Sequence, residues 1–135
     1  MPLMHWSPNL SVGIDFIDSE HQQLMAGINQ LHELLNAGQH ERLADALDDL
    51  LHKTREHFEH EENTMRDNGY RHLKHHKGLH DALLEELEEF RDRTASNDMH
   101  AGTELSDFLK DWLLEHILES DKHLGGFLEG VASKS

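Results

Sequence analysis

The chain has no cysteine and only two prolines, both within its first eight residues. Without thiols, disulfides, iron–sulfur clusters, zinc–thiolate sites and cysteine nucleophiles are all excluded. Because proline interrupts helices more strongly than any other residue, its absence after Pro8 permits long, unbroken helices. The sequence also lacks an apolar run of the roughly 18 residues that a membrane-spanning helix needs, and its N-terminus does not resemble a signal peptide. We therefore expect a cytoplasmic protein without a membrane partner.

Basic residues are scarce, since 12 Lys+Arg against 27 Asp+Glu give a formal net charge of −15. Nucleic-acid binding depends on Lys and Arg that displace counterions from phosphates, so this charge argues against a DNA or RNA partner. A length of 135 residues, of which 36% are hydrophobic, predicts a single domain over 1–135 with a modest core. Histidine, by contrast, is abundant, with 14 residues.

Glycines beside small or polar residues predict turns at Gly38, at Gly69 and near Gly102 with the preceding Ser96-Asn97-Asp98. Between these turns, the apolar residues recur at spacings of three and four, as on one face of a helix. The expected helices are 19–37, 41–67, 70–94 and 103–122. Short turns between them predict an all-α fold, an up-down-up-down antiparallel four-helix bundle.

The segments outside the expected bundle are an N-terminal arm, 1–17, and a short C-terminal helix or tail, 123–135. Ser19 and Gln22 have capping-box spacing, which predicts the start of the first helix at Ser19. The arm carries apolar residues that we expect to pack on the bundle, namely Trp6, Val12, Ile14 and Phe16.

Histidines and carboxylates occupy core-facing positions on all four expected helices. They are His21, His57, Glu61, His76, His80 and His116, together with Asp121, which lies one residue beyond the next core-facing position of its helix. Burying such groups without partners would cost several kcal/mol, so the pattern predicts a bound cation. Counting from the turns places all seven near one end of the bundle: Glu61 lies eight residues before Gly69, and His76 lies seven after it.

The spacing within helices supports a shared site for two of the pairs. His57 with Glu61, and His76 with His80, are four residues apart, which is about 400° of helix rotation, so both members can face one ion. His116 and Asp121 are five apart, about 500°, so Asp121 must reach around or the helix must bend. The remaining histidines are expected on the solvated surface: His5, His32, His40, His52, His60, His72, His75, His100 and His123.

Five imidazoles and two carboxylates are too many ligands for one tetrahedral zinc ion. Two ions bridged by the carboxylates fit better. Imidazole with carboxylate suits iron best, while manganese, zinc and cobalt stay open on ligand type alone.

These residues and their spacings resemble the hemerythrin signature over nearly the whole chain. The matching elements are His21, His57-Phe58-x-x-Glu61, His76-x-x-x-His80 and Trp112-Leu113-x-x-His116-Ile117-x-x-x-Asp121. Ile17-Asp18-x-x-His21, together with Tyr70, is similar to the bacterial branch, the bacteriohemerythrins. Two positions depart from that branch: Arg71 follows Tyr70 where proline is common, and Glu20 stands where glutamine is common.

The resemblance implies two non-heme, oxo- or hydroxo-bridged irons. In the implied arrangement His76, His80 and His116 hold one iron, His21 and His57 hold the other, and Glu61 and Asp121 bridge them. It further implies that the protein is not an enzyme but binds O2 reversibly, held as hydroperoxide on the two-histidine iron, for transport, storage or delivery.

Apolar residues within about one helical step of the expected ligands would form a dry wall around the O2 position. They are Leu24, Phe58, Trp112, Leu113 and Ile117, with Leu113 the best candidate for contact with O2. Water and protons hasten the loss of bound oxygen, so such a wall favours reversible binding.

Three other functions are alternatives to O2 carriage. A di-iron oxidase of the ferritin-like kind uses Glu-x-x-His pairs, and this sequence contains none. An O2 or redox sensor would use the same centre with a fused or partner signalling domain, and the ligand set does not separate sensing from carriage. A metalloprotease is excluded because no His-Glu pair has a second histidine at the required spacing. We expect a monomer.

Overall fold

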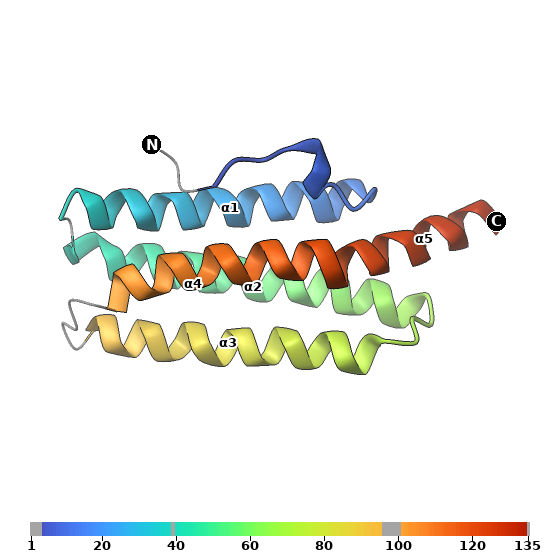
Figure 1. The fold of residues 1–135 in the computed structure, drawn as a ribbon. Coiled ribbons are helices and arrows are strands. Elements are labelled where there is room, and N and C mark those ends of the chain that lie inside the picture. Colours follow the sequence, from blue (N-terminus) through green and yellow to red (C-terminus); the bar gives the residue numbers. More distant parts are fainter. Residues whose placement is uncertain (1–3, 39, 96–100, 135) are drawn as a thin grey trace.

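The structure is a computed structural model that describes residues 4–38, 40–95 and 101–134, and these residues contain helices but no strand. Four long helices run in alternating directions (Figure 1): α1 (Asp15–Asn36), α2 (His40–Asp67), α3 (Leu73–Ala95) and α4 (Ala101–His116). Helices α1 and α3 each pack against both α2 and α4. The predicted up-down-up-down four-helix bundle is therefore confirmed.

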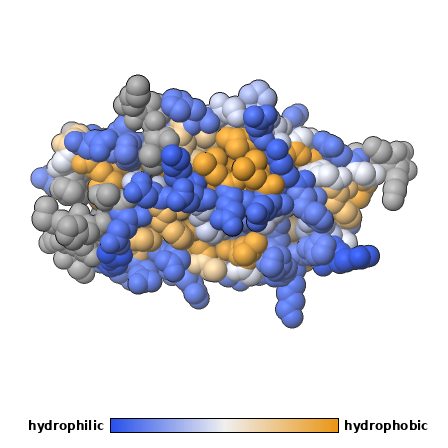
Figure 2. Space-filling model, viewed as in Figure 1, coloured by the Kyte–Doolittle hydropathy of each residue, from blue (hydrophilic) through white to orange (hydrophobic). Residues whose placement is uncertain are grey.

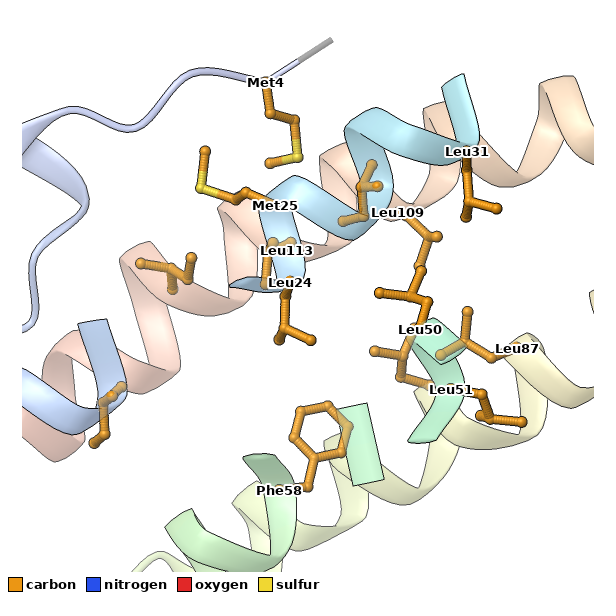
Figure 3. Packing of buried hydrophobic residues seen from close by; sticks show 14 of the residues in the cluster. Met4, Leu24, Met25, Leu31, Leu50, Leu51, Phe58, Leu87, Leu109 and Leu113 are labelled. Carbon is orange, nitrogen blue, oxygen red and sulfur yellow. The ribbon is translucent and has the colours of Figure 1, made fainter. Parts of the chain in front are cut away.

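The bundle interior is built from the stripes that the sequence predicted. On α1 the buried side chains recur every three or four residues, at Ile17, His21, Leu24, Ile28 and Leu31. Figure 3 shows leucines and Phe58 from different helices turned into the shared interior. Burial of such side chains stabilises the fold by about 1.5–3 kcal/mol for each large apolar residue.

Helix α1 begins at Asp15, about one turn before the predicted start at Ser19. A 3-10 helix, η1 (Pro8–Leu10), precedes the extended residues up to Ile14, and α1 starts at Asp15. The carboxylate of Asp18 accepts hydrogen bonds from the Val12 N–H, at 2.9 Å, and from the Ser11 hydroxyl, at 2.5 Å. This contact with the arm, rather than Ser19, organises the helix start, so the predicted start was wrong.

The apolar residues of the arm pack on the bundle with one exception. Val12 is buried, and Trp6 and Ile14 are partly buried against the core, whereas Phe16 is 38% exposed. The prediction for Phe16 was therefore wrong, because a start at Asp15 turns this residue away from the core.

The turn after α2 delays the start of α3 from the predicted residue 70 to Leu73. Gly69 has a φ of 64°, a left-handed conformation that glycine adopts without strain. The Tyr70 N–H donates to the Met65 carbonyl and the Gly69 N–H to that of Arg66, which is a Schellman ending. This ending holds Tyr70 outside both helices.

The C-terminal part continues α4 instead of forming a separate tail. A π-helix, η2 (Ile117–Asp121), follows α4 without a break and leads into α5 (Lys122–Lys134). The predicted short C-terminal helix from residue 123 corresponds to α5, whereas Gly102 lies within α4 rather than in a turn. The predicted turn residues Ser96, Asn97 and Asp98 lie outside the described residues.

Hydrophilic residues are spread over the face of the molecule drawn in Figure 2, with hydrophobic ones gathered in patches between them. Of the helices described, none is both long enough and apolar enough to cross a membrane.

Candidate metal centre

The structure brings the seven predicted ligand side chains together in the core, at the end of the bundle that carries the α2–α3 turn. Their potential ligand atoms form two groups, and within each group the atoms lie within 4.8 Å of one another. One group is Glu61, His76, His80, His116 and Asp121, and the other is His21, His57, Glu61 and Asp121. All seven are at most 6% exposed, and the two carboxylates belong to both groups.

The π-helix explains how Asp121 joins this cluster. In α-helical geometry it would point about 140° away from His116. Hydrogen bonds in a π-helix span five residues, and the Lys122 N–H here donates to the Ile117 carbonyl, so the chain turns less at each residue. As a result, Asp121 Oδ1 lies 3.1 Å from His116 Nε2. The five-residue spacing of His116 and Asp121 predicted that the helix must bend or Asp121 must reach around, and the π-helix is the local change that brings the two side chains together.

The polar atoms of the cluster are oriented for a cation rather than for each other. All four carboxylate oxygens of Glu61 and Asp121 are buried without a hydrogen-bond partner, as is Nε2 of His21 and of His80. The Nε2 atoms of His76 and His116 face each other at 3.1 Å. One of these rings can donate to the other, and a metal ion would take the place of that proton. The donor set of nitrogen and carboxylate oxygen therefore fits first-row transition metals.

Charges within the cluster shift the pKa values of its members. Burial lowers the pKa of His57, but the charge of Glu61 and the contacts with Glu20 and Glu61 outweigh it and raise this pKa to about 10. Burial by itself would raise the pKa of Glu61, yet the charge of His57 and the contacts with the surrounding imidazoles hold it well below its ordinary value. For Asp121, burial and the nearby charge of Glu61 would raise the pKa. The contacts with the imidazoles of His116, His21 and His76 outweigh them and lower it. Both carboxylates are thus held as anions, which is the form that ligates a metal.

Two further glutamates, which the sequence analysis did not assign to the site, orient the ligand imidazoles. Glu20, on α1, accepts a hydrogen bond from His57 Nδ1 at 2.8 Å. Glu62, on α2, accepts one from His80 Nδ1 at 2.9 Å. Such a partner leaves Nε2 free for the metal and fixes the ring orientation. No spacing signal pointed to Glu62, whereas Glu20 had stood out only as a departure from the family pattern.

Two aromatic rings stack on imidazoles of the cluster. The Phe58 ring stacks on His80 with 3.7 Å between centroids and planes 2° apart. The Trp112 ring stacks on His116 at 4.4 Å and 14°. Each imidazole is thereby confined to one plane beside the site.

An apolar cavity of about 20 Å³ lies next to these stacked rings, since Phe58 and Trp112 are part of its lining. Four of the five predicted wall residues line it, namely Leu24, Phe58, Trp112 and Leu113. Leu24, Phe58 and Leu113 face this interior from three different helices in Figure 3. The fifth, Ile117, is fully buried in η2 but does not line the cavity. The hydroxyl of Thr54, also in the wall, donates to the Leu50 carbonyl at 2.7 Å, so no free donor points inward from it.

The other histidines lie away from the cluster, as expected. Those with exposed side chains are His5, His52, His60, His72, His75 and His123, while His32 is half-buried. The side chains of His40 and His100 are outside the described part of the chain. His60 is exposed but contacts Glu20 through Nδ1, so it supports the cluster from outside.

Comparison with known proteins places this geometry in a family. The family model described as the hemerythrin HHE cation binding domain matches residues 12–128. A bacteriohemerythrin of Pseudomonas aeruginosa is 32% identical over 93% of this chain and 80% of its own length. One from Clostridium acetobutylicum is 32% identical over 87% of this chain and 95% of its own.

Solved structures agree with the sequence relatives. A crystal structure of wild-type hemerythrin is similar with a TM-score of 0.86 and 27% identity, over 92% of this chain and 96% of that chain. A variant of hemerythrin with leucine replaced by alanine reaches a TM-score of 0.88. The family match over most of the chain, the shared bundle and the buried cluster of histidines and carboxylates together show that this chain belongs to the hemerythrin family.

Proposed function

We propose that this protein binds O2 reversibly at two non-heme irons, as a carrier or store of oxygen. Glu61 and Asp121 would bridge the ions, because they are the members common to both ligand groups. His76, His80 and His116 would complete one ion and His21 with His57 the other. When bound, the irons supply the electrons that O2 binding requires, and the chain supplies the surroundings that make binding reversible.

The residues of the chain perform two tasks at this centre. Glu20 and Glu62 hold the rings of His57 and His80 so that each Nε2 faces inward. The apolar cavity places a hydrocarbon wall beside Phe58 and Trp112, whose rings stack on His80 and His116. The cavity wall offers no free proton donor, because it is almost wholly hydrocarbon and its Thr54 hydroxyl already donates to the Leu50 carbonyl.

The apolar cavity is the observation that favours O2 binding over oxidation of a second substrate. A volume of about 20 Å³ accommodates one small molecule, since a water already needs roughly 10–15 Å³ by this measure. Its wall is almost wholly hydrocarbon and it is lined by Leu113, which lies three residues from His116. An organic substrate does not fit there.

The proposal is tested by metal analysis and optical spectroscopy. We expect two irons per chain and, after anaerobic reduction, an absorption band that appears with O2 and disappears when the O2 pressure is lowered. Leu113→Ser should hasten the oxidation of the reduced protein by admitting water. Leu43→Ala, which removes a buried leucine near the far end of α2, is the matched control and should leave the oxidation rate unchanged.

Two results would overturn this function. One metal per chain, or zinc in protein from iron-replete cells, would contradict the di-iron centre. Continuous O2 consumption with an added reductant or ferrous iron, without a reversible band, would show an oxidase instead.

A further inference from the structure

A second group of histidines gathers at the surface, outside the buried centre. A pocket of about 290 Å³ opens where the α2–α3 turn meets η2 and α5. Its lining consists of Tyr70, His72, His75, His76, Glu119, Ser120 and His123. His72, His75 and His123 are exposed, and the buried centre does not use them. Side chains that are far apart in the sequence thus present three imidazoles and a carboxylate to one hollow.

Two of these imidazoles are spaced as ligands of one ion. The ring centroids of His72 and His123 are 5.1 Å apart, with planes at 77°. Within the buried centre the corresponding separations are 4.6 Å for His76 with His80 and 4.8 Å for His21 with His57. The surface pair therefore has a ring separation and an interplanar angle similar to those of the buried pairs.

A hydrogen-bond partner at one ring nitrogen orients His123, as is usual for histidines that ligate a metal. Its Nδ1 lies 2.6 Å from the Tyr70 hydroxyl, so this nitrogen already has a partner. Nε2 stays available, and a hydrogen bond at the other ring nitrogen is the arrangement that orients a ligand imidazole. Tyr70 itself is buried and anchored by the Schellman turn, which makes it a rigid support.

The pocket shares one wall with the buried centre. The His76 ring lines the pocket, and its Nε2 lies 2.9 Å from Asp121 Oδ1 on the inner side. His76 is only 2% exposed, so its imidazole separates the two sites. A cation in the pocket would thus lie one ring away from the cluster, on a chain whose net charge of −15 attracts cations.

We propose that the exposed imidazoles of His72 and His123 form a surface site for a divalent transition metal, and that ferrous iron bound there passes to the buried centre, whose ligand His76 lines the same pocket. Imidazole and carboxylate ligands select first-row divalent ions. The surface site stands on its own geometry, whereas the delivery of iron rests on the proposed function.

The surface site is tested by nickel titration of the iron-loaded protein, with calorimetry as the readout and iron content checked before and after. We expect the wild-type protein to bind one equivalent of Ni²⁺ that the double variant His72→Ala/His123→Ala does not bind. His52→Ala is the matched control, since His52 is exposed and pairs only with Glu56 on its own helix, and it should keep this equivalent. Equal nickel binding by the double variant and the wild type would overturn the surface site.

The delivery step is tested by the rate at which metal-free protein takes up limiting Fe²⁺ without oxygen. We expect the double variant to load several-fold more slowly than wild type and His52→Ala, yet to reach the same final iron content. If the double variant and the wild type load iron at equal rates, the delivery of iron through the surface site is wrong. The nickel titration would still decide whether the surface site exists. If the wild type takes up no iron, the proposed function and delivery fail together, and the same nickel titration of the iron-free wild type and double variant decides the surface site.

Discussion

At the scale of single residues, the most informative contact is that between Glu20 and two histidines. Its Oε1 accepts from His57 Nδ1, and its Oε2 lies 2.5 Å from His60 Nδ1. Glutamine is common at this position in the bacterial branch, and an amide oxygen could accept only the first of these bonds while its NH₂ faces the second ring. A carboxylate suits both imidazoles, so the departure at Glu20 and the histidine at position 60 are physically linked.

Removing this carboxylate should loosen the metal. We expect Glu20→Ala to weaken iron binding about 10–100-fold, the usual effect of losing a partner of a ligand histidine. Glu20→Gln should lose less iron affinity than Glu20→Ala, because its amide oxygen can still accept a hydrogen bond from His57 Nδ1. Competition with a chelator of known affinity measures both.

Glu33→Ala, an exposed change on the same helix, is the control and should bind iron as the wild type does. If Glu20→Ala holds iron as tightly as Glu33→Ala, the contact does not orient His57 for the metal.

At the scale of elements, the arm and α5 approach each other closely at Gly125. A Cβ at this position would lie 2.0 Å from the Val12 carbonyl oxygen and 3.0 Å from its carbon. The absence of a side chain lets the arm lie against the helix that continues from the metal centre. Asp18 fixes the other side of the same stretch by accepting from the Val12 N–H.

Alanine at two adjacent glycines should therefore have opposite effects. Gly125→Ala forces the arm away and is expected to lower the free energy of unfolding by about 1–3 kcal/mol, as overpacking does. Gly126→Ala meets nothing within 4 Å and should raise it by about 0.5–1 kcal/mol through helix propensity. Urea denaturation of the iron-loaded proteins measures both. A stabilising Gly125→Ala would show that the arm is not held against α5.

At the scale of the whole molecule, the bundle encloses a cluster of charged side chains that a bound cation would stabilise. Glu61 and Asp121 are fully buried, and their oxygens lack hydrogen-bond partners. An ion that binds only the folded chain stabilises it, by about 4 kcal/mol when free metal exceeds its dissociation constant a thousandfold. The metals are thus expected to contribute a large part of the stability of a single small domain.

Chelation should therefore lower the melting temperature, and added Fe²⁺ under anaerobic conditions should restore it. Thermal unfolding followed by circular dichroism measures the change, with iron content determined at each step. The same melting temperature with and without iron would mean that protons or water compensate the seven side chains as well as the metals do.

The ends of the helices show where local sequence signals are insufficient. The stripes of apolar residues predicted four helices and their order correctly, because that periodicity is what a helix needs to bury one face. The start at Ser19 was wrong because the contact of Asp18 with Ser11 and Val12 starts the helix a turn earlier. The boundary near residue 122 coincides with the start of α5, but no sequence signal showed that a π-helix joins α4 to α5 without a break.

The sequence by itself determined the bundle and the level at which the polar core positions gather, because a period of three to four residues and the distance from each turn follow from helix geometry. The family, and with it the place of Asp121 in the ligand set, came from the resemblance of the motifs to the hemerythrins. Only the tertiary structure decided how Asp121 reaches His116, since one widened turn changes the direction of a side chain without changing the residue spacing. It also decided the partners from other elements, Glu20 on His57 and Tyr70 on His123. Such contacts depend on how helices lie against each other, and no single helix encodes that.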